Sequence, residues 1–188
     1  MAREFLKAVR DRLFARLTVM RLRWSGAQVG AALRVRGNIP YLLNEGRVRI
    51  GDRVRLRNEP ARIRFRTTTR GCISLGDDVS LNAGVSLFSD ASIEVGSASR
   101  IGDNCTIFDT NFHAVHEGQK CRPRPVRIGR NVWLGRNVTV LPGVTIGDHS
   151  VIAAGAVVFA SVPEREVWRG NPAEFVKAVQ AGDGFVRQ

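Results

Sequence analysis

The chain has few cysteines, few aromatic side chains and no long apolar run, and each scarcity excludes a class of protein. Cys72, Cys105 and Cys121 are too scattered for a disulfide framework and lack a paired metal spacing such as C-x-x-C, so Cys72 and Cys105 are interpreted as small packing residues. No apolar segment approaches the ~18 residues that cross a bilayer. The N-terminus lacks the apolar core and cleavage site of a signal peptide, so we expect a cytoplasmic protein, with peripheral association at the inner membrane surface as an alternative.

Acidic residues are scarce in one part of the chain only. Residues 1–70 hold 18 Lys or Arg against 5 Asp or Glu, whereas residues 71–188 hold 11 against 12. The net charge of +12 over 188 residues therefore belongs to the first 70. Because few aromatics are available to stack on bases and no recognition module is present, we expect no nucleic-acid partner.

A six-residue repeat organises most of the chain. Branched aliphatic residues recur at every sixth position, and a second column four residues further along is small or β-branched. The first column is Ile128, Leu134, Val140, Ile146, Ile152 and Val158, and the second is Val132, Val138, Val144, Ser150, Ala156 and Val162. The same register appears at Leu75, Leu81, Leu87 and Ile93, resumes after a two-residue slip at Val95, Ile101 and Ile107, and is blurred at Val29, Val35 and Ile50.

A period of six fits neither a helix nor a plain strand, but it fits a short strand followed by a turn. Three such units make a triangular coil of about 18 residues, and stacked coils align parallel strands about 4.8 Å apart. The aliphatic column then points inward. Turn sequences such as IGDN at Ile101–Asn104 and IGRN at Ile128–Asn131 supply residues suited to tight or positive-φ geometry.

Two basic segments lie in the first 70 residues. Residues 1–26 predict an amphipathic helix with arginines around an apolar face, which contains Leu6, Val9, Leu13, Leu17, Met20 and Trp24. That helix packs on the coil or a neighbouring subunit, or lies on an anionic membrane surface. In residues 47–66 arginines alternate with apolar residues, which predicts a basic outer wall. The wall is either simply solvated or contacts an anionic membrane or another acidic partner.

Two segments interrupt or follow the repeat. Residues 108–127 are polar, contain two of the three histidines, and predict an external loop. Residues 164–188 predict a C-terminal tail with a short helix near Glu174–Gln180. The β-helical part is therefore expected over residues 27–163.

The tail VWLGRNVTVLPGVTIGDHSVIAAGAVV…VPEREVWRGNPA, from Val132 to Ala173, resembles the closing coils of hexapeptide-repeat acyltransferases, and is most similar to the galactoside, maltose and polysaccharide O-acetyltransferases. The resemblance implies an all-β fold, a left-handed parallel β-helix. It also implies a homotrimer, acetyl-CoA as co-substrate and a sugar or polysaccharide hydroxyl as acceptor.

Histidine is the expected general base. No G-x-S-x-G elbow is present and no cysteine lies in an evident nucleophile context, so direct acyl transfer is more economical than an acyl-enzyme. His113 in DTNFHAVH begins the insert and matches the first histidine of an H-x-x-H segment that carries the catalytic base in the similar enzymes. His116 matches the second histidine and is expected to assist or orient the acceptor.

The resemblance also implies binding residues. Asn82 and Asp90, eight residues apart, match an Asn and an Asp that hold acceptor hydroxyls, although both residue types are also ordinary in turns. In that family the acceptor site lies between subunits, so these residues are expected to face a neighbour's His113. Trp133, Gly135 and Ala154 match positions lining the coenzyme groove, where the Gly135 N–H is expected to face the thioester carbonyl.

Two departures from the family pattern leave the donor open. Phe159 stands where the family often has Thr, and Glu174 stands where it often has Arg or Lys. An acyltransferase using another donor, such as an acidic acyl carrier protein, is therefore one alternative, and a non-catalytic β-helical binding module is another. Metal catalysis is not expected, because His113, His116 and His149 lack the spacing of the related metalloenzymes.

Overall fold

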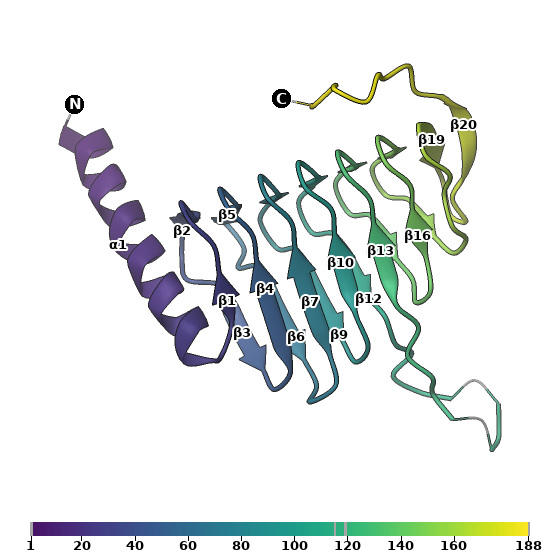
Figure 1. Cartoon of the computed structure of the whole chain (residues 1–188), viewed down its shortest axis with the longest axis horizontal. Coiled ribbons are helices and arrows are strands. Elements are labelled where there is room, and N and C mark those ends of the chain that lie inside the picture. Colours follow the sequence, from purple (N-terminus) through teal and green to yellow (C-terminus); the bar gives the residue numbers. More distant parts are fainter. Residues whose placement is uncertain (1, 115, 119, 188) are drawn as a thin grey trace.

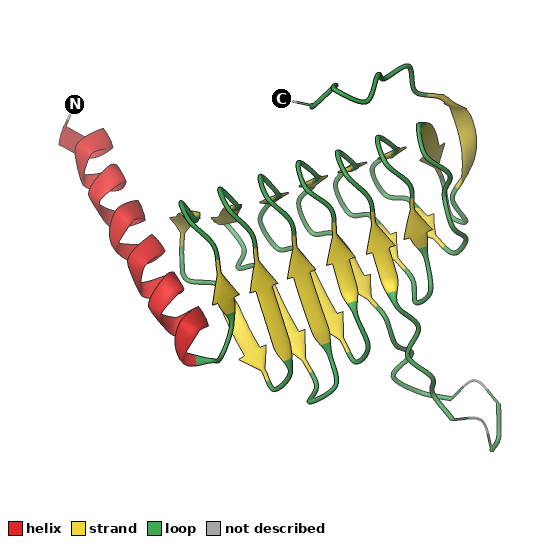
Figure 2. Ribbon diagram, in the orientation of Figure 1, coloured by secondary structure: helices red, strands yellow, loops and turns green. Residues whose placement is uncertain are grey.

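The computed structural model describes residues 2–114, 116–118 and 120–187, with side chains described from Val9 onward. Over these residues a single helix precedes a stack of short parallel strands, which winds as a left-handed β-helix (Figures 1 and 2). The predicted coil of hexapeptide repeats is confirmed, and so is the helix before it.

Three sheets form the walls of the prism. Sheet A contains β1 (Gln28–Val29), β4 (Arg47–Ile50), β7 (Cys72–Leu75), β10 (Ile93–Val95), β13 (Val126–Ile128) and β16 (Thr145–Ile146). Sheet B contains β2 (Arg34–Gly37), β5 (Arg55–Asn58), β8 (Ser80–Leu81), β11 (Arg100–Ile101), β14 (Trp133–Leu134), β17 (Val151–Ile152), β19 (Glu166–Arg169) and β20 (Glu174–Ala178). Sheet C contains β3 (Tyr41–Asn44), β6 (Arg64–Thr67), β9 (Ser86–Ser89), β12 (Thr106–Phe108), β15 (Thr139–Val140) and β18 (Val157–Val158). The A–B, B–C and C–A edges are the turns between successive sheets.

Both predicted columns line the interior. From Leu75 to Val162 all their members are buried, and Phe65 is the largest of the core side chains. The two-residue slip has a structural cause, because Ile93 and Val95 both point inward from the longer strand β10. Asn104 and Asn131 have φ values of 57° and 54°, as their turns require.

Helix α1 (Ala2–Trp24) packs against β2 at the N-terminal end of the prism (Figure 1). Thr18 and Leu22 are buried there, with Ala15 and Val19 partly covered. The predicted apolar face points elsewhere: the exposed fractions of Val9, Leu13, Met20 and Trp24 are 47%, 55%, 53% and 91%. Leu17 is half-buried, and the side chain of Leu6 lies outside the described residues. Most of the predicted stripe is therefore not what holds the helix to the coil.

The short helix predicted near Glu174–Gln180 is wrong. Residues Glu174–Ala178 form β20, which pairs antiparallel with β19. The edge of sheet B is open after the last coil, and a strand there satisfies backbone groups that an isolated helical turn would leave without tertiary support. Beyond β20 the tail returns along sheet B, where Arg100 and Asn131 donate hydrogen bonds to the carbonyls of Arg187 and Phe185.

Candidate active site

The loop carrying the two histidines leaves the C–A edge between β12 and β13 (Figure 1). Its base is fastened by Asp109, whose side chain is fully buried. The carboxylate accepts hydrogen bonds from the Ser89 hydroxyl at 2.7 Å and from the N–H groups of Asp90 and Ala91 at 2.8 and 2.9 Å. The Arg124 N–H donates to the Asp109 carbonyl at 2.7 Å, so the two ends of the loop are joined.

An aromatic contact fixes the first part of the loop to sheet C. The Phe112 ring lies 4.9 Å from the Phe88 ring and 6.1 Å from the Phe108 ring, measured between centroids. The Arg66 guanidinium lies 5.1 Å from the Phe88 centroid on the same outer wall. His113 follows Phe112 directly, so this cluster restricts where the imidazole can reach.

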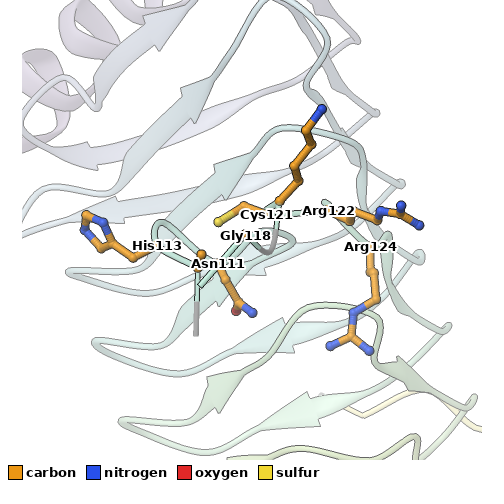
Figure 3. A pocket seen from close by; sticks show the side chains of 8 residues that line it. Asn111, His113, Gly118, Cys121, Arg122 and Arg124 are labelled. Atoms are coloured by element: carbon orange, nitrogen blue, oxygen red, sulfur yellow. The ribbon is translucent and has the colours of Figure 1, made fainter. Parts of the chain in front are cut away.

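His113 is exposed and lines a cavity of about 670 Å³. Figure 3 shows its ring pointing away from Arg122 and Arg124, which line the same cavity. No hydrogen bond joins His113 to another side chain among the described residues. Its lone pair is therefore available to a substrate proton, which a general base needs. His116 is also exposed on this loop.

Asp90 lies at the same edge, one coil before the loop. Its carboxylate accepts hydrogen bonds from the Thr68 hydroxyl at 2.5 Å and from the Arg70 guanidinium at 2.9 Å. These donors hold the ionised side chain in one orientation, with 17% of it exposed. Asp90 can therefore accept from a hydroxyl group brought to this edge.

The other predicted residues lie at the B–C edge. Asn82 follows β8 and is half-buried; Gly135 follows β14, and Ala154 follows β17. Trp133 projects from the outer face of sheet B with 48% of its side chain exposed. The predicted role of the Gly135 N–H is wrong, because it donates to the Ile152 carbonyl at 2.8 Å within the coil ladder. Ala154 is an exposed residue, and its N–H has no hydrogen-bond acceptor within the part of the chain that the structure describes.

A single chain thus divides the predicted site between two edges. His113, His116 and Asp90 lie at the C–A edge, whereas Asn82, Gly135 and Ala154 lie at the B–C edge. The wall of sheet C separates them, and a four-residue strand such as β9 spans about 13 Å. One copy of the chain therefore does not bring the proposed base and Asn82 together.

Several supporting residues escaped the sequence analysis. Asp109 orders the loop base, Thr68 and Arg70 orient Asp90, and Phe112 anchors the segment before His113. The position of Asp109, near the start of the predicted insert and directly after β12, was the one available signal. The Asp90 donors come from a preceding coil, and the sequence period does not say which turn residues meet across coils.

The cysteines differ in their surroundings. Cys105 is buried, donates from Sγ to the Gly135 carbonyl at 3.0 Å, and has its thiol pKa raised by burial to about 11. It is therefore a packing residue, as predicted, rather than a thiolate at neutral pH. Cys121 is exposed and lines the His113 cavity. Within residues 2–114, 116–118 and 120–187 no group of three His, Cys, Asp or Glu side chains is arranged to hold a metal ion.

Comparisons with known proteins agree with this architecture. Residues 125–160 match the family model "Bacterial transferase hexapeptide (six repeats)". The putative lipopolysaccharide biosynthesis O-acetyl transferase WbbJ of Escherichia coli is 33% identical over 149 residues, which cover 73% of this chain and 74% of that protein. The chain is a hexapeptide-repeat acyltransferase.

Other matches cover different shares of this acyltransferase. Galactoside O-acetyltransferase of E. coli is 33% identical over 59% of this chain and 56% of its own length. The solved acetyltransferase VCA0836 of Vibrio cholerae, complexed with acetyl coenzyme A, is 29% identical over 62% of this chain and 66% of that chain, with a TM-score of 0.57. The N-acyltransferase AntD of Bacillus cereus, with a TM-score of 0.72 over 86% of this chain and 88% of that chain, is 18% identical and shares the fold.

Proposed function

We propose that the protein transfers an acetyl group from acetyl-CoA to a hydroxyl of a sugar or polysaccharide. The carrying observation is His113, an exposed imidazole without a side-chain partner among the described residues, on a loop whose base is fastened beside Asp90. The named activity of the WbbJ relative and the acetyl-CoA complex of VCA0836 support the choice of donor and reaction.

The reaction needs no covalent enzyme intermediate. His113 takes the proton of the acceptor hydroxyl as its oxygen attacks the thioester carbonyl, and collapse of the tetrahedral intermediate releases the coenzyme thiolate. The thiolate then takes up the proton. Asp90 and Asn82 hold neighbouring hydroxyls of the acceptor. Cys121 has no part in this scheme, so Cys121→Ser should retain turnover, whereas an acyl-cysteine mechanism would lose it.

The donor is proposed to lie along the B–C edge. The Trp133 face and the backbone at Gly135 and Ala154 would line the pantetheine arm. Because the Gly135 N–H is bonded within the ladder, the Ala154 N–H is the better donor to the developing oxyanion. Arg136 is exposed directly after Gly135 and would supply a cation for the coenzyme phosphates near this edge.

A homotrimer would complete the site. Since the C–A and B–C edges are separated within one chain, we propose that His113 of one subunit faces Asn82 and the donor groove of its neighbour. Mixing unfolded His113→Ala and Asn82→Ala chains and refolding them together tests this arrangement. Random assembly regenerates an intact site at about one interface in four, so about a quarter of the activity should return. A site within one chain would regain none.

Association with an anionic membrane is proposed for α1. The exposed stripe of Val9, Leu13, Met20 and Trp24 is flanked by exposed arginines, which complement anionic headgroups, and Trp favours the membrane interface. Among the described residues, no helix is long and apolar enough to cross a bilayer. The stripe would therefore lie in the plane of a cytoplasmic membrane surface.

An acceptor screen tests the reaction itself. Purified protein with acetyl-CoA and a panel of sugars and glycans should release free thiol only when an acceptor is present, and the product should carry one acetyl group on oxygen. Transfer to amines alone would replace the proposal with N-acetylation. Release of thiol with an acyl carrier protein and none with acetyl-CoA would transfer the proposal to that donor.

A further inference from the structure

A groove between α1 and sheet B has an unusual excess of positive charge. Its volume is about 460 Å³, and it is lined by residues of the helix and of β2, β5 and β8, together with Asn82. The arginines in its lining are Arg12, Arg34, Arg36, Arg55 and Arg57, whereas Asp11 is the one carboxylate among them. The groove lies at the N-terminal end of sheet B. The returning C-terminal tail contacts Arg100 and Asn131 in later coils, so these contacts do not cover the groove.

Four of these arginines form a two-by-two lattice on the outer wall. Arg34 pairs directly with Arg55, and Arg36 pairs with Arg57, in the register of the parallel strands. All four are exposed, and the strand and residue spacings place their Cα atoms about 5 Å apart across the ladder and about 7 Å apart along it. Like charges placed directly opposite each other destabilise a sheet, so this arrangement is costly without an anion.

The carboxylates nearby neutralise little of this charge. Arg57 donates to Asp103 at 2.6 Å, and Asp11 accepts from Arg10 and from the Gly37 N–H. Within the described part of the chain, Arg12, Arg34, Arg36 and Arg55 form no ion pair. Burial and the nearby Arg55 cation also lower the pKa of Arg100, one coil further along the same wall. Four guanidinium groups are therefore left for a ligand.

We propose that this groove binds a phosphate or diphosphate group carried by the acceptor. Guanidinium groups pair with phosphate oxygens in a bidentate manner, and several of them on a rigid sheet need little ordering when the anion binds. The inference rests on the proposed transfer to a sugar, because Asn82 lines the same groove and would hold an acceptor hydroxyl. The acceptor is then a sugar linked to a nucleotide or to a lipid through phosphate, rather than a free sugar.

Calorimetry with inorganic pyrophosphate tests the groove without any catalysis. The wild-type protein should bind pyrophosphate, more weakly as salt is raised. Arg34→Gln/Arg55→Gln should weaken binding by about 100-fold, roughly tenfold for each guanidinium group removed. Arg55→Lys keeps the charge but removes the planar fork, and should weaken binding by less than Arg55→Gln. Arg34 and Arg55 are exposed, so thermal melts should show that these variants are folded.

A matched control removes the same charge from the other two walls. Arg47 and Arg64 are exposed on β4 and β6 and lie outside the groove, so Arg47→Gln/Arg64→Gln should bind pyrophosphate like the wild type. If both double variants lost the same pyrophosphate affinity, the anion would be attracted by the overall positive charge of the protein rather than by the groove, and the proposal would be overturned. Absence of pyrophosphate binding by the wild type at low salt would also overturn it.

Two further arms identify the source of the phosphate. A nucleoside diphosphate sugar in solution is compared with neutral phosphatidylcholine vesicles containing a polyprenyl diphosphate, and the groove variants should lose whichever ligand the wild type prefers. His113→Ala should bind pyrophosphate as the wild type does, whatever its catalytic defect. Failure of acetyl transfer and failure of the anion site are therefore separate results.

Discussion

The early coils, residues 27–70, and the late coils, residues 71–163, share one interior but differ outside. In the early coils, four-residue strands such as β2, β4, β5 and β6 alternate exposed arginines with buried residues. In the late coils, β14 to β18 have two residues each and point Trp, Thr or Val outward. Parallel partners lie 18 residues apart from β13 to β18, as for Trp133 and Val151, and 25 residues apart for Arg47 and Cys72.

The comparison shows which parts of a solenoid are free to carry function. The narrow interior is filled almost entirely by close-packed apolar side chains, so it leaves no room for a substrate. The outer walls and edges carry no such demand. The early coils use this freedom for charge, and the late coils use it for the loop with His113 and for the proposed donor edge.

The largest expected difference between the two regions is catalytic. His113→Ala should lower kcat by about 10²- to 10⁴-fold, because the acceptor hydroxyl loses its base. Arg47→Gln/Arg64→Gln removes two early charges from walls outside the proposed site and should leave kcat unchanged with a water-soluble acceptor. Thiol release from acetyl-CoA measures both effects. Undiminished turnover by folded His113→Ala would remove the histidine from the mechanism.

The interior and its period could be predicted from the sequence, because each coil places apolar side chains at equivalent inward positions. The lengths of the turns at the edges could not be predicted in this way. Structurally equivalent inward residues of successive strands are six apart from Ile128 to Val158, but they are eight apart from Leu87 in β9 to Val95 in β10 and 21 apart from Ile107 in β12 to Ile128 in β13. Both longer steps lie at the C–A edge, where Asp90 and the histidine loop are found.

The residue pattern therefore predicted the site only as single residues, and the arrangement between subunits came from the resemblance. The resemblance supplied His113, Asn82 and Asp90, but assigning them to two edges needs the position of every turn. The Gly135 role failed for a similar reason, because its N–H was already bonded to the neighbouring coil. The prediction of which helix face packs on the coil was wrong, because Leu22 and Thr18, rather than the larger apolar stripe, contact β2 and its neighbours.

A second prediction sharpens the comparison at the tightly stacked late coils. In Gly135→Ala, the new Cβ would lie 2.6 Å from the Ala154 nitrogen and 3.0 Å from the Ala153 carbonyl carbon, so the two coils must separate. The free energy of unfolding should fall by about 1–3 kcal/mol, and coenzyme A should bind more weakly at the displaced edge. Urea unfolding and calorimetry measure the two changes.

Gly182→Ala is the matched control, because nothing lies within 4 Å of a Cβ at that position. It should change stability by no more than about 0.5 kcal/mol. If Gly135→Ala were as stable as this control, the coils would separate at this position with no loss in the free energy of unfolding, which would contradict the prediction.

A third prediction concerns what the exposed face of α1 contacts. Leu13→Gln/Met20→Gln removes two apolar side chains that are each more than half exposed, so the fold should keep its stability. Sedimentation with anionic vesicles should weaken by about tenfold or more, because burying one such side chain contributes about 1.5–3 kcal/mol. Equal sedimentation with neutral vesicles would contradict a role for the arginines. A change of oligomeric state in light scattering would assign this face to another subunit.

The smallest expected effect concerns the A–B edge, where early and late coils use one backbone shape for different side chains. Arg53 has a φ of 55° at this turn in an early coil, and Asn131 and His149 have φ values of 54° and 63° in late coils. Of these three residue types, histidine is the one whose ordinary pKa lies near neutral pH. The His149 side chain is buried between Arg130 and Asn131, and burial, reinforced by the Arg130 charge, lowers its pKa below the ordinary 6.5.

The sign of the resulting pH dependence follows from proton uptake. Below about pH 6.5 the unfolded chain protonates this histidine while the folded chain does not, so the free energy of unfolding falls as the pH is lowered. The loss stops once the pH lies below the folded-state pKa, and above pH 6.5 the group contributes no slope. His149→Asn keeps a residue that tolerates positive φ, as Asn131 does one coil earlier, and removes the titration. Urea midpoints on either side of pH 6.5 should therefore differ less in His149→Asn than in the wild type, and an equal difference would assign the acid sensitivity to other groups.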